Sequence, residues 1–189
     1  MFTYTIDQEL SLKLVETGDA GRIFELTDQS RTYLRQWLPW VDFTKTPGDS
    51  LEYIEMSRKA YSEKRGMNAA ILFQGQIAGI AGYNHIDWTN KTVSIGYWLG
   101  HEYQGHGIMT RAVQALTNYA ILDLHLNRVE IRAATENAKS RSIPERLGYT
   151  YEGCIRQNEW LYDHYVDHAV YGMLADEWTS EEARQTAGL

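Results

Sequence analysis

The sequence has little cysteine and little proline. Its 189 residues include one cysteine, Cys154, so no disulfide can form within the chain. Its three prolines stand at isolated positions, and no Pro/Ser-rich linker, repeat or low-complexity segment divides it. Because a chain of this length supports one well-buried core, we predict a single domain over residues 1–178, followed by a polar tail over 179–189.

Long apolar runs are also missing. No stretch approaches the ~18 apolar residues that a membrane-spanning helix needs. The N-terminal segment "MFTYTIDQEL" lacks the basic region and the apolar core of a signal peptide. We therefore expect a cytoplasmic protein with no membrane partner.

Positive charge is scarce as well, with 18 basic against 25 acidic residues and a formal net charge of −7. A nucleic-acid-binding protein needs a basic face to replace phosphate counterions, so the composition argues against a nucleic-acid partner. An acidic surface instead attracts cationic partners such as amines or basic peptides.

The hydrophobic pattern predicts a mixed α+β domain. Strands are expected in the first 15 residues, in three turn-linked segments (68–75, 76–87 and 92–100), over 128–134, and in a closing hairpin (149–162 and 164–174). Helices are expected over 17–38, 50–66, about 109–120 and 140–149. The order predicts a mostly antiparallel sheet flanked by helices, with one strand–helix–strand crossover in its middle.

Capping residues mark the expected helix ends. Asp19 and Ser50 are predicted N-caps, and Gly66 is predicted to stop the second helix. Pro144 favours a last helix that begins near Ser140, because a missing N–H is harmless only in the first helical turn.

The segment "HEYQGHGIMTRAV" (residues 101–113) places Gly105 and Gly107 between a strand and an amphipathic helix. Glycines allow close backbone approach, and free N–H groups at a helix start attract an anion. The segment matches neither the P-loop nor the dinucleotide fingerprint. Taken alone, it is more typical of an ordinary tight turn than of an anion site.

Other segments extend this pattern in chain order: "LRQWLPWV" before it, then "NAKSRSIPERLGY" and "YVDHAVYGMLADEW" after it. Together with "YWLGHEYQGHGIMTRAV", they resemble the GCN5-related N-acetyltransferase (GNAT) family, and within it the RimJ/RimL group of ribosomal-protein N-terminal acetyltransferases. The resemblance runs from about residue 8 to Trp178 and implies the GNAT fold, acetyl-CoA as acetyl donor, and no metal.

The resemblance also implies which residues hold the cofactor. The turn from Gln104 to Thr110 would cradle the pyrophosphate through backbone N–H groups, with the neighbouring strand supplying an oxyanion donor from a bulged segment. The full expected set is Trp98, Leu99, Gln104, Gly105, His106, Gly107, Ile108, Met109, Thr110, Asn137 and Ser140. Met109 stands where the signature has Gly or Ala, which matters little if only its backbone is used.

Ser140 is the predicted catalytic residue, as the donor to the departing thiolate. The resemblance places it with Asn137 along the pantetheine arm. Local capping of the following helix is the competing interpretation, since Asn and Ser are both good N-caps.

The general base is left open. Ser94 stands where relatives often carry glutamate, so that role cannot be transferred to it. Candidates are His85, Asp87 and Glu159. An α-amine with a pKa near ~8 needs less help than a lysine ε-amine near ~10.4, so a weak base or an ordered water suffices.

The acceptor side is predicted at Trp37, Trp40, Asn84, His85 and Tyr97. The two tryptophans are equally consistent with packing over the core. Tyr83 and Trp98 are further candidates for the cleft border, although strand alternation predicts that Tyr97 and Trp98 do not both face it. Cys154 is expected to be a small buried residue.

Three functions follow. The leading one is direct acetyl transfer to an amine, with a protein N-terminus, such as that of a ribosomal protein, as the favoured acceptor. A small amine such as a polyamine, an aminoglycoside or an amino-acid analogue is the alternative, and a non-catalytic CoA-binding module is the third. A homodimer is compatible with the 12% aromatic content.

Overall fold

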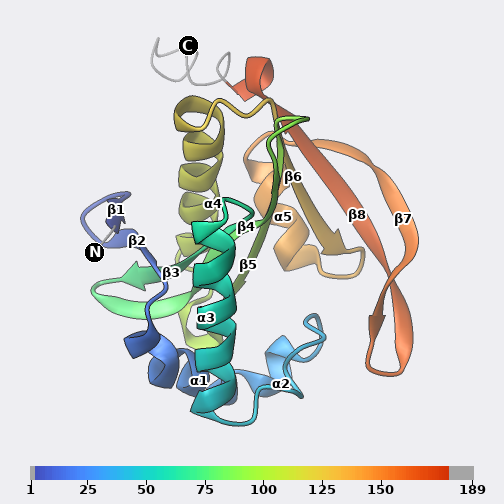
Figure 1. Ribbon diagram of the computed structural model, residues 1–189. Coiled ribbons are helices and arrows are strands. Elements are labelled where there is room, and N and C mark those ends of the chain that lie inside the picture. The colour runs from blue at the N-terminus through green and yellow to red at the C-terminus, as the bar shows by residue number, and fades with distance from the viewer. Residues whose placement is uncertain (1–2, 179–189) are drawn as a thin grey trace.

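The computed structural model describes residues 3–178, and its centre is one eight-stranded sheet (Figure 1). The strand order is β1-β2-β3-β4-β5-β6-β8-β7, and β5–β6 is the parallel pair among antiparallel neighbours. The strands are β1 (Thr3–Thr5), β2 (Leu10–Leu14), β3 (Met67–Phe73), β4 (Gln76–Asp87), β5 (Thr92–Leu99), β6 (Arg128–Ala134), β7 (Thr150–Leu161) and β8 (His164–Leu174). The predicted α+β class and the mostly antiparallel sheet are confirmed.

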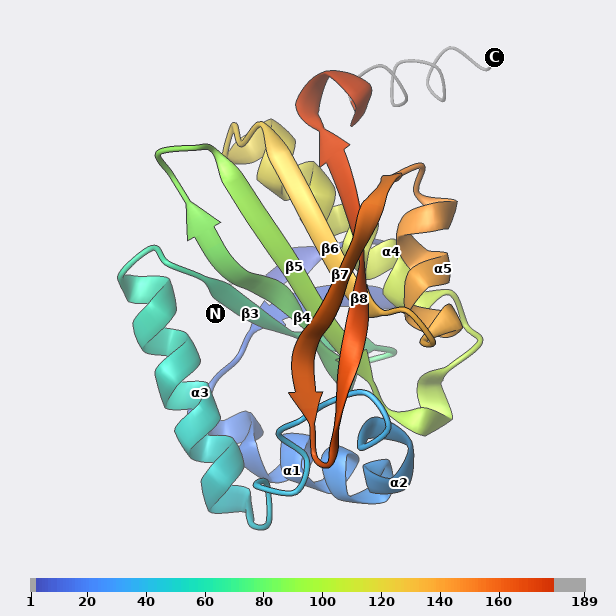
Figure 2. The ribbon, with the colours of Figure 1, turned by 90° about the vertical axis from the view of Figure 1, so that its right-hand side faces the viewer.

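Helices pack on both faces of the sheet (Figure 2). They are α1 (Ala20–Gln29), α2 (Arg31–Leu34), α3 (Pro47–Ser62), α4 (Ile108–Asn118) and α5 (Ala138–Arg146). Single turns add η1 (Thr17–Asp19), η2 (His101–Tyr103) and the π-helical η3 (Tyr119–Asp123). The apolar stripe of α4 packs into the larger core on one face, whereas α1 and α3 enclose a second cluster on the other.

The turns between strands follow the sequence closely. Gln74 and Gly75, with φ of +50° and +81°, join β3 to β4, as the tight Gln-Gly turn predicts. The predicted crossover is confirmed too, because α4 connects β5 to β6 and the two strands run parallel.

The parallel pair is short. Thr92–Ile95 of β5 pairs with 128–131 of β6, and beyond Ile95 the two strands separate. The remaining part of β5 stays paired with β4, while β6 continues along β8. The sheet therefore opens between its two central strands, and this opening positions the candidate site.

Two predicted helix ends are wrong. The second helix begins at Pro47, because a capping box precedes it: the Thr46 hydroxyl oxygen accepts from Asp49 N at 3.4 Å, and the Asp49 carboxylate accepts from Thr46 N at 2.7 Å. Ser50 is buried inside this helix, and the helix ends at Ser62, before Gly66.

The side chain of Asp19 does not cap α1. Its carboxylate accepts instead from Lys13 Nζ at 2.6 Å and from Glu16 N at 2.9 Å. The predicted long helix over 17–38 is divided into η1, α1 and α2.

Pro144 lies inside α5 and not in its first turn, because Asn137 caps a helix that begins at Ala138. Cys154 is exposed, contrary to prediction, because it lies on β7, an edge strand whose residues are mostly exposed. The predicted polar tail, 179–189, lies outside the described residues. Within the described part of the chain, no helix is long and apolar enough to span a membrane.

Candidate functional site

A cavity of about 850 Å³ lies where β5 and β6 have separated, between residues 97–99 of β5 and the segment after β6 that carries Asn137 and Ser140. One part of its wall comes from the starts of α4 and α5, including Ile108 and Ser140, and another from α2 and the segment after it, including Leu34 and Trp37. Its walls thus come from both helical layers, and the separated strands allow the cavity to reach them.

The start of α4 forms the polar end of the cavity. Gly105 and Gly107 line it with φ of +83° and +66°, in the left-handed region that favours glycine. A Cβ on either residue would meet no protein atom within 4 Å, so the backbone conformation, and not crowding, requires glycine there.

Gly107 is also the N-cap of α4 and offers no side chain to the first-turn N–H groups. Those groups have no acceptor within the helix, and the helix dipole adds partial positive charge at the same point. The amide Nε2 of Gln104 is buried in this wall and has no hydrogen-bond partner among the described residues. These donors fit a pyrophosphate.

Charge in the cavity is of one sign. Three cations line it, Arg111, Lys139 and Arg146, and no Asp, Glu or His within residues 3–178 belongs to its lining. Arg111 is paired with Asp7 at 2.6 Å. Arg146 donates to two hydroxyls, Thr110 Oγ1 at 3.1 Å and Ser142 Oγ at 2.8 Å. In a chain of net charge −7, this cationic lining suits a polyanionic ligand.

Ser140 is fixed at the first turn of α5. Its backbone N donates to Asn137 Oδ1 at 3.1 Å, so Asn137 is the N-cap and the capping interpretation holds for that oxygen. The Ser140 hydroxyl donates to Tyr97 Oη at 3.3 Å, and the Tyr97 hydroxyl donates to the Ser140 carbonyl at 3.0 Å. Burial raises the pKa of Tyr97 well above its usual value.

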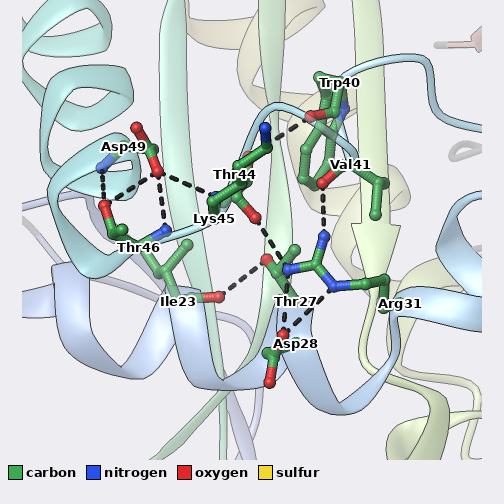
Figure 3. A network of polar contacts seen from close by, with 10 residues as sticks. All are labelled: Ile23, Thr27, Asp28, Arg31, Trp40, Val41, Thr44, Lys45, Thr46 and Asp49. Carbon is green, nitrogen blue, oxygen red and sulfur yellow. Dashed lines mark hydrogen bonds and ion pairs between the residues drawn. The ribbon is translucent and has the colours of Figure 1, made fainter.

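The segment after α2 is held over the cavity by side chains on both sides. Figure 3 shows Arg31 donating to the carbonyls of Val41 at 2.6 Å and Thr44 at 2.8 Å. From the β7–β8 turn, the Tyr162 hydroxyl donates to the Leu38 carbonyl, and Arg35 lies 4.0 Å over the Tyr162 ring. The segment that carries Trp37 and Trp40 is therefore anchored at both ends.

Comparison with known proteins identifies this architecture. The family model for the acetyltransferase (GNAT) domain matches residues 9–150. The chain belongs to the GNAT acetyltransferase family. A putative ribosomal N-acetyltransferase of Bacillus subtilis, YdaF, is 35% identical over 186 residues, which cover 96% of this chain and all of YdaF.

Two solved structures extend the match. RimL, a ribosomal L7/L12 alpha-N-protein acetyltransferase in complex with coenzyme A, matches this acetyltransferase with a TM-score of 0.90 at 25% identity, over 93% of this chain and 99% of RimL. The microcin C7 self immunity acetyltransferase MccE, in complex with acetyl-CoA and AMP, matches with a TM-score of 0.85 at 29% identity, over 89% of this chain and 94% of MccE. The predicted family, GNAT fold and N-acetyltransferase class are confirmed, and the bound ligands agree with the expected acetyl-CoA cofactor.

The structure brings most of the expected cofactor residues of this acetyltransferase together. Those lining the cavity are Trp98, Leu99, Gln104, Gly105, Gly107, Ile108, Met109, Thr110, Asn137 and Ser140. His106 does not line it, and its exposed ring lies 6.0 Å from the ring of Phe73.

The expected acceptor residues are divided. Trp37 and Tyr97 line the cavity, whereas Trp40 packs on Trp98 with ring centroids 5.8 Å apart. Tyr83 is buried in the core, where its hydroxyl donates to the Leu116 carbonyl, so it is not at the cleft border. Asn84 and His85 are exposed on β4 outside the lining.

Tyr97 and Trp98 both line the cavity, contrary to the alternation argument. They do belong to opposite faces of the sheet, since Tyr97 packs on the larger core cluster and Trp98 on the smaller. The cavity reaches both because β5 and β6 have separated there. The register shift lies on β4 at Asn84, not on the predicted strand, and the Asn84 side chain lies against Gly96 of β5.

None of the three candidate bases lines the cavity. Asp87 is committed to a turn, accepting from Asn90 N at 2.9 Å, and this backbone hydrogen bond lowers its pKa. Glu159 is partly buried on β7, with an oxygen 3.4 Å from His168 Nε2. Glu130 stands in register with Ser94 on the neighbouring strand, but its oxygens are paired with Arg128 and Arg132.

Several lining residues were not anticipated from the sequence: Tyr33, Leu34, Leu38, Tyr103, Arg111, Lys139, Ser142, Ile143 and Arg146. The sequence could have predicted part of this set, because Lys139, Ser142 and Arg146 follow each other at helical spacing and so lie on one face of α5. Among the described residues, no three His, Cys, Asp or Glu side chains are grouped to hold a metal ion.

Proposed function

We propose that this acetyltransferase binds acetyl-CoA in the cavity between β5 and β6 and transfers the acetyl group directly to the α-amine of a protein N-terminus in the cytoplasm. The observation that supports the donor is the uncapped start of α4, with Gly105 and Gly107 at positive φ beside a cationic lining. The names of RimL and YdaF support the acceptor class.

In this proposal the first-turn N–H groups of α4, from Ile108 to Thr110, donate to the pyrophosphate, and Arg146 neutralises part of its charge. Gln104 contributes its buried amide nitrogen, which has no hydrogen-bond partner in the part of the chain that the structure describes. Asn137 orients α5, and Ser140 lies in the cavity wall as the donor to the leaving sulfur.

The reaction needs few protein groups. The neutral amine attacks the thioester carbonyl, the new C–N bond forms, the C–S bond breaks, and the proton released by the nitrogen is balanced by a proton on the departing thiol. Among residues 3–178, no carboxylate or imidazole lines the cavity, so the amine reacts from the neutral minority of its population. Glu159, partly buried on β7 outside the lining, is the base that we retain from the three candidates.

A small amine is the second candidate acceptor, and MccE, with AMP in its structure, is the observation that favours it. The lining cations are Arg111, Lys139 and Arg146, and they belong to the polar end assigned to the cofactor. They therefore do not discriminate between a polyamine, an aminoglycoside and an amino-acid analogue.

The test is thiol release across a panel of N-terminal peptides and small amines, with wild type and Ser140→Ala. Turnover on peptides with little turnover on small amines supports the proposed acceptor, and the reverse selects the second candidate. Acetyl-CoA binding without thiol release from any acceptor would leave the non-catalytic CoA-binding module and overturn the proposal.

We also propose a homodimer. The large exposed hydrophobic side chains of Phe43, Trp160 and Tyr165 support it, because extensive exposed apolar surface marks contact sites. A mass of one chain in light scattering at micromolar concentration would contradict this assignment.

A further inference from the structure

We propose that Pro144 is a positioning residue for the acetyl transfer. By withholding a backbone N–H from the Ser140 carbonyl, it leaves that carbonyl to the Tyr97 hydroxyl, and Tyr97 in turn holds the Ser140 hydroxyl. This inference rests on the proposed role of Ser140 as the donor to the leaving sulfur.

The first step concerns the helix hydrogen bonds. In an α-helix, the N–H of residue i donates to the carbonyl of residue i−4, so the donor for Ser140 would be residue 144. That residue is a proline inside α5, which has no N–H and whose ring also displaces the i−4 carbonyl. The Ser140 carbonyl therefore lacks the regular donor four residues ahead, although it lies in a partly buried site where a carbonyl needs a donor.

The second step concerns Tyr97, a residue of β5, the strand that faces the start of α5. Its hydroxyl donates to the Ser140 carbonyl at 3.0 Å, in the place of the missing N–H. A phenol carries one proton, so the Tyr97 oxygen can only accept from the Ser140 hydroxyl, which lies 3.3 Å away. The proline thus determines the direction of both hydroxyl protons.

The third step is chemical. Ser140 is held at its nitrogen by Asn137, at its carbonyl by Tyr97, and at its hydroxyl by the same Tyr97 oxygen. As the C–S bond breaks, the Ser140 hydroxyl turns from the Tyr97 oxygen to the sulfur and donates a hydrogen bond there. The Tyr97 proton stays on the carbonyl, and burial disfavours its loss, so Tyr97 positions the donor and Ser140 acts on the leaving group.

Pro144→Ala tests this arrangement, because alanine restores an N–H directed at the Ser140 carbonyl and so makes the Tyr97 hydroxyl less necessary there. We expect kcat to fall about tenfold with an unchanged KM for acetyl-CoA, while the melting temperature stays the same or rises, since alanine suits a helix interior better than proline. Pro47→Ala is the matched control: Pro47 stands at the first position of α3, where no N–H is required, so its kcat should not change. A kcat of Pro144→Ala within twofold of wild type overturns the proposal.

A double-mutant cycle with Tyr97→Phe separates positioning from general structure. Tyr97→Phe leaves the carbonyl without a donor, so it should lower the denaturant midpoint clearly in the wild-type background and less with alanine at 144, where the helix supplies the donor. If Tyr97→Phe lowers the denaturant midpoint equally in both backgrounds, Tyr97 and residue 144 do not act on the same carbonyl, and the proposal is overturned. This coupling is a stability measurement and needs no substrate. It therefore tests whether residue 144 and Tyr97 donate to the same carbonyl even if the thiol-release assays show that the proposed function is wrong.

Discussion

Arg146, at the end of α5, donates to the Thr110 hydroxyl in the first turn of α4 at 3.1 Å. This bond joins the two helices that supply the polar end of the cavity. Among the described residues, the hydrogen-bond partners of Arg146 are uncharged hydroxyls, so its guanidinium is available to neutralise a phosphate.

Arg146→Gln should therefore weaken acetyl-CoA binding. Hydrogen bonds to charged groups contribute about 1.5–3 kcal/mol, so we expect the Kd to rise roughly ten- to a hundredfold. Calorimetric titration measures it, and the loss should shrink at high salt because the interaction is electrostatic. Arg58→Gln, on the exposed surface of α3, is the control, and a Kd of Arg146→Gln equal to that of Arg58→Gln would remove Arg146 from the site.

Gly105→Ala should reduce acetyl-CoA affinity more than it reduces stability. Its φ of +83° is almost the same as the +81° of Gly75 in the β3–β4 turn, and neither has a neighbour within 4 Å of an added Cβ. Both alanine variants should lose about 1 kcal/mol of unfolding free energy. Only Gly105→Ala should bind acetyl-CoA weakly, and parallel binding curves for the two variants would contradict the cradle.

Trp37→Ala should raise the KM for the amine acceptor severalfold, with a smaller effect on the Kd of acetyl-CoA, because Trp37 lines the cavity on the α2 side. Trp88→Ala is the comparison, since Trp88 is exposed and its indole donates to the Lys64 carbonyl outside the lining. Steady-state kinetics with varied acceptor distinguishes them. An unchanged acceptor KM in Trp37→Ala would assign this residue to packing alone.

The acid stability of the sheet edge should depend on Glu152. Arg128 donates to both Glu152 oxygens at 2.5 Å, and these hydrogen bonds lower the pKa of Glu152 below its usual 4.5. A lowered pKa stabilises the fold above about pH 4.5 and ceases to do so as the pH falls through the folded-state value. Glu152→Gln should therefore be less stable than wild type at pH 7, by about 0.5–1 kcal/mol for a partly exposed pair, and equal to it at pH 2.

Urea titrations at the two pH values measure the difference. A stability loss of the same size at both would show that packing, and not the charge of Glu152, is responsible.

The sequence predicted the strands and turns whose conformation depends on residues close together in the chain. The alternation in "NAAILFQG" and "QIAGIAGYNHID" predicted β3 and β4, and Gln74–Gly75 marked their turn, because side-chain period and glycine conformation are properties of neighbouring residues. The start of α3 was misassigned although its signal was present: Thr46, Pro47 and Asp49 form an N-cap, an N1 proline and an N3 acid.

The candidate site also has parts that depend on nearby residues and parts that depend on distant ones. The glycine turn could be predicted, since positive φ and an uncapped helix start are encoded within a few residues. The joint lining by Tyr97 and Trp98 could not, because it depends on where β6 stops pairing with β5, and paired residues of the two strands are 36 positions apart in the chain. The bond between Tyr97 and Ser140 needs the same long-range register and so has no local signature.

The short pairing of β5 with β6 makes the molecule two half-sheets joined by a seam of four residues on each strand. A molecule bound in the opening of that seam contacts both halves at once and so links them. By mass action, a ligand at 100 times its Kd adds about 2.7 kcal/mol to the unfolding free energy. Amide hydrogen exchange along Thr92–Ile95 should therefore slow when acetyl-CoA is present. Exchange of these amides would then detect acetyl-CoA binding without any amine acceptor.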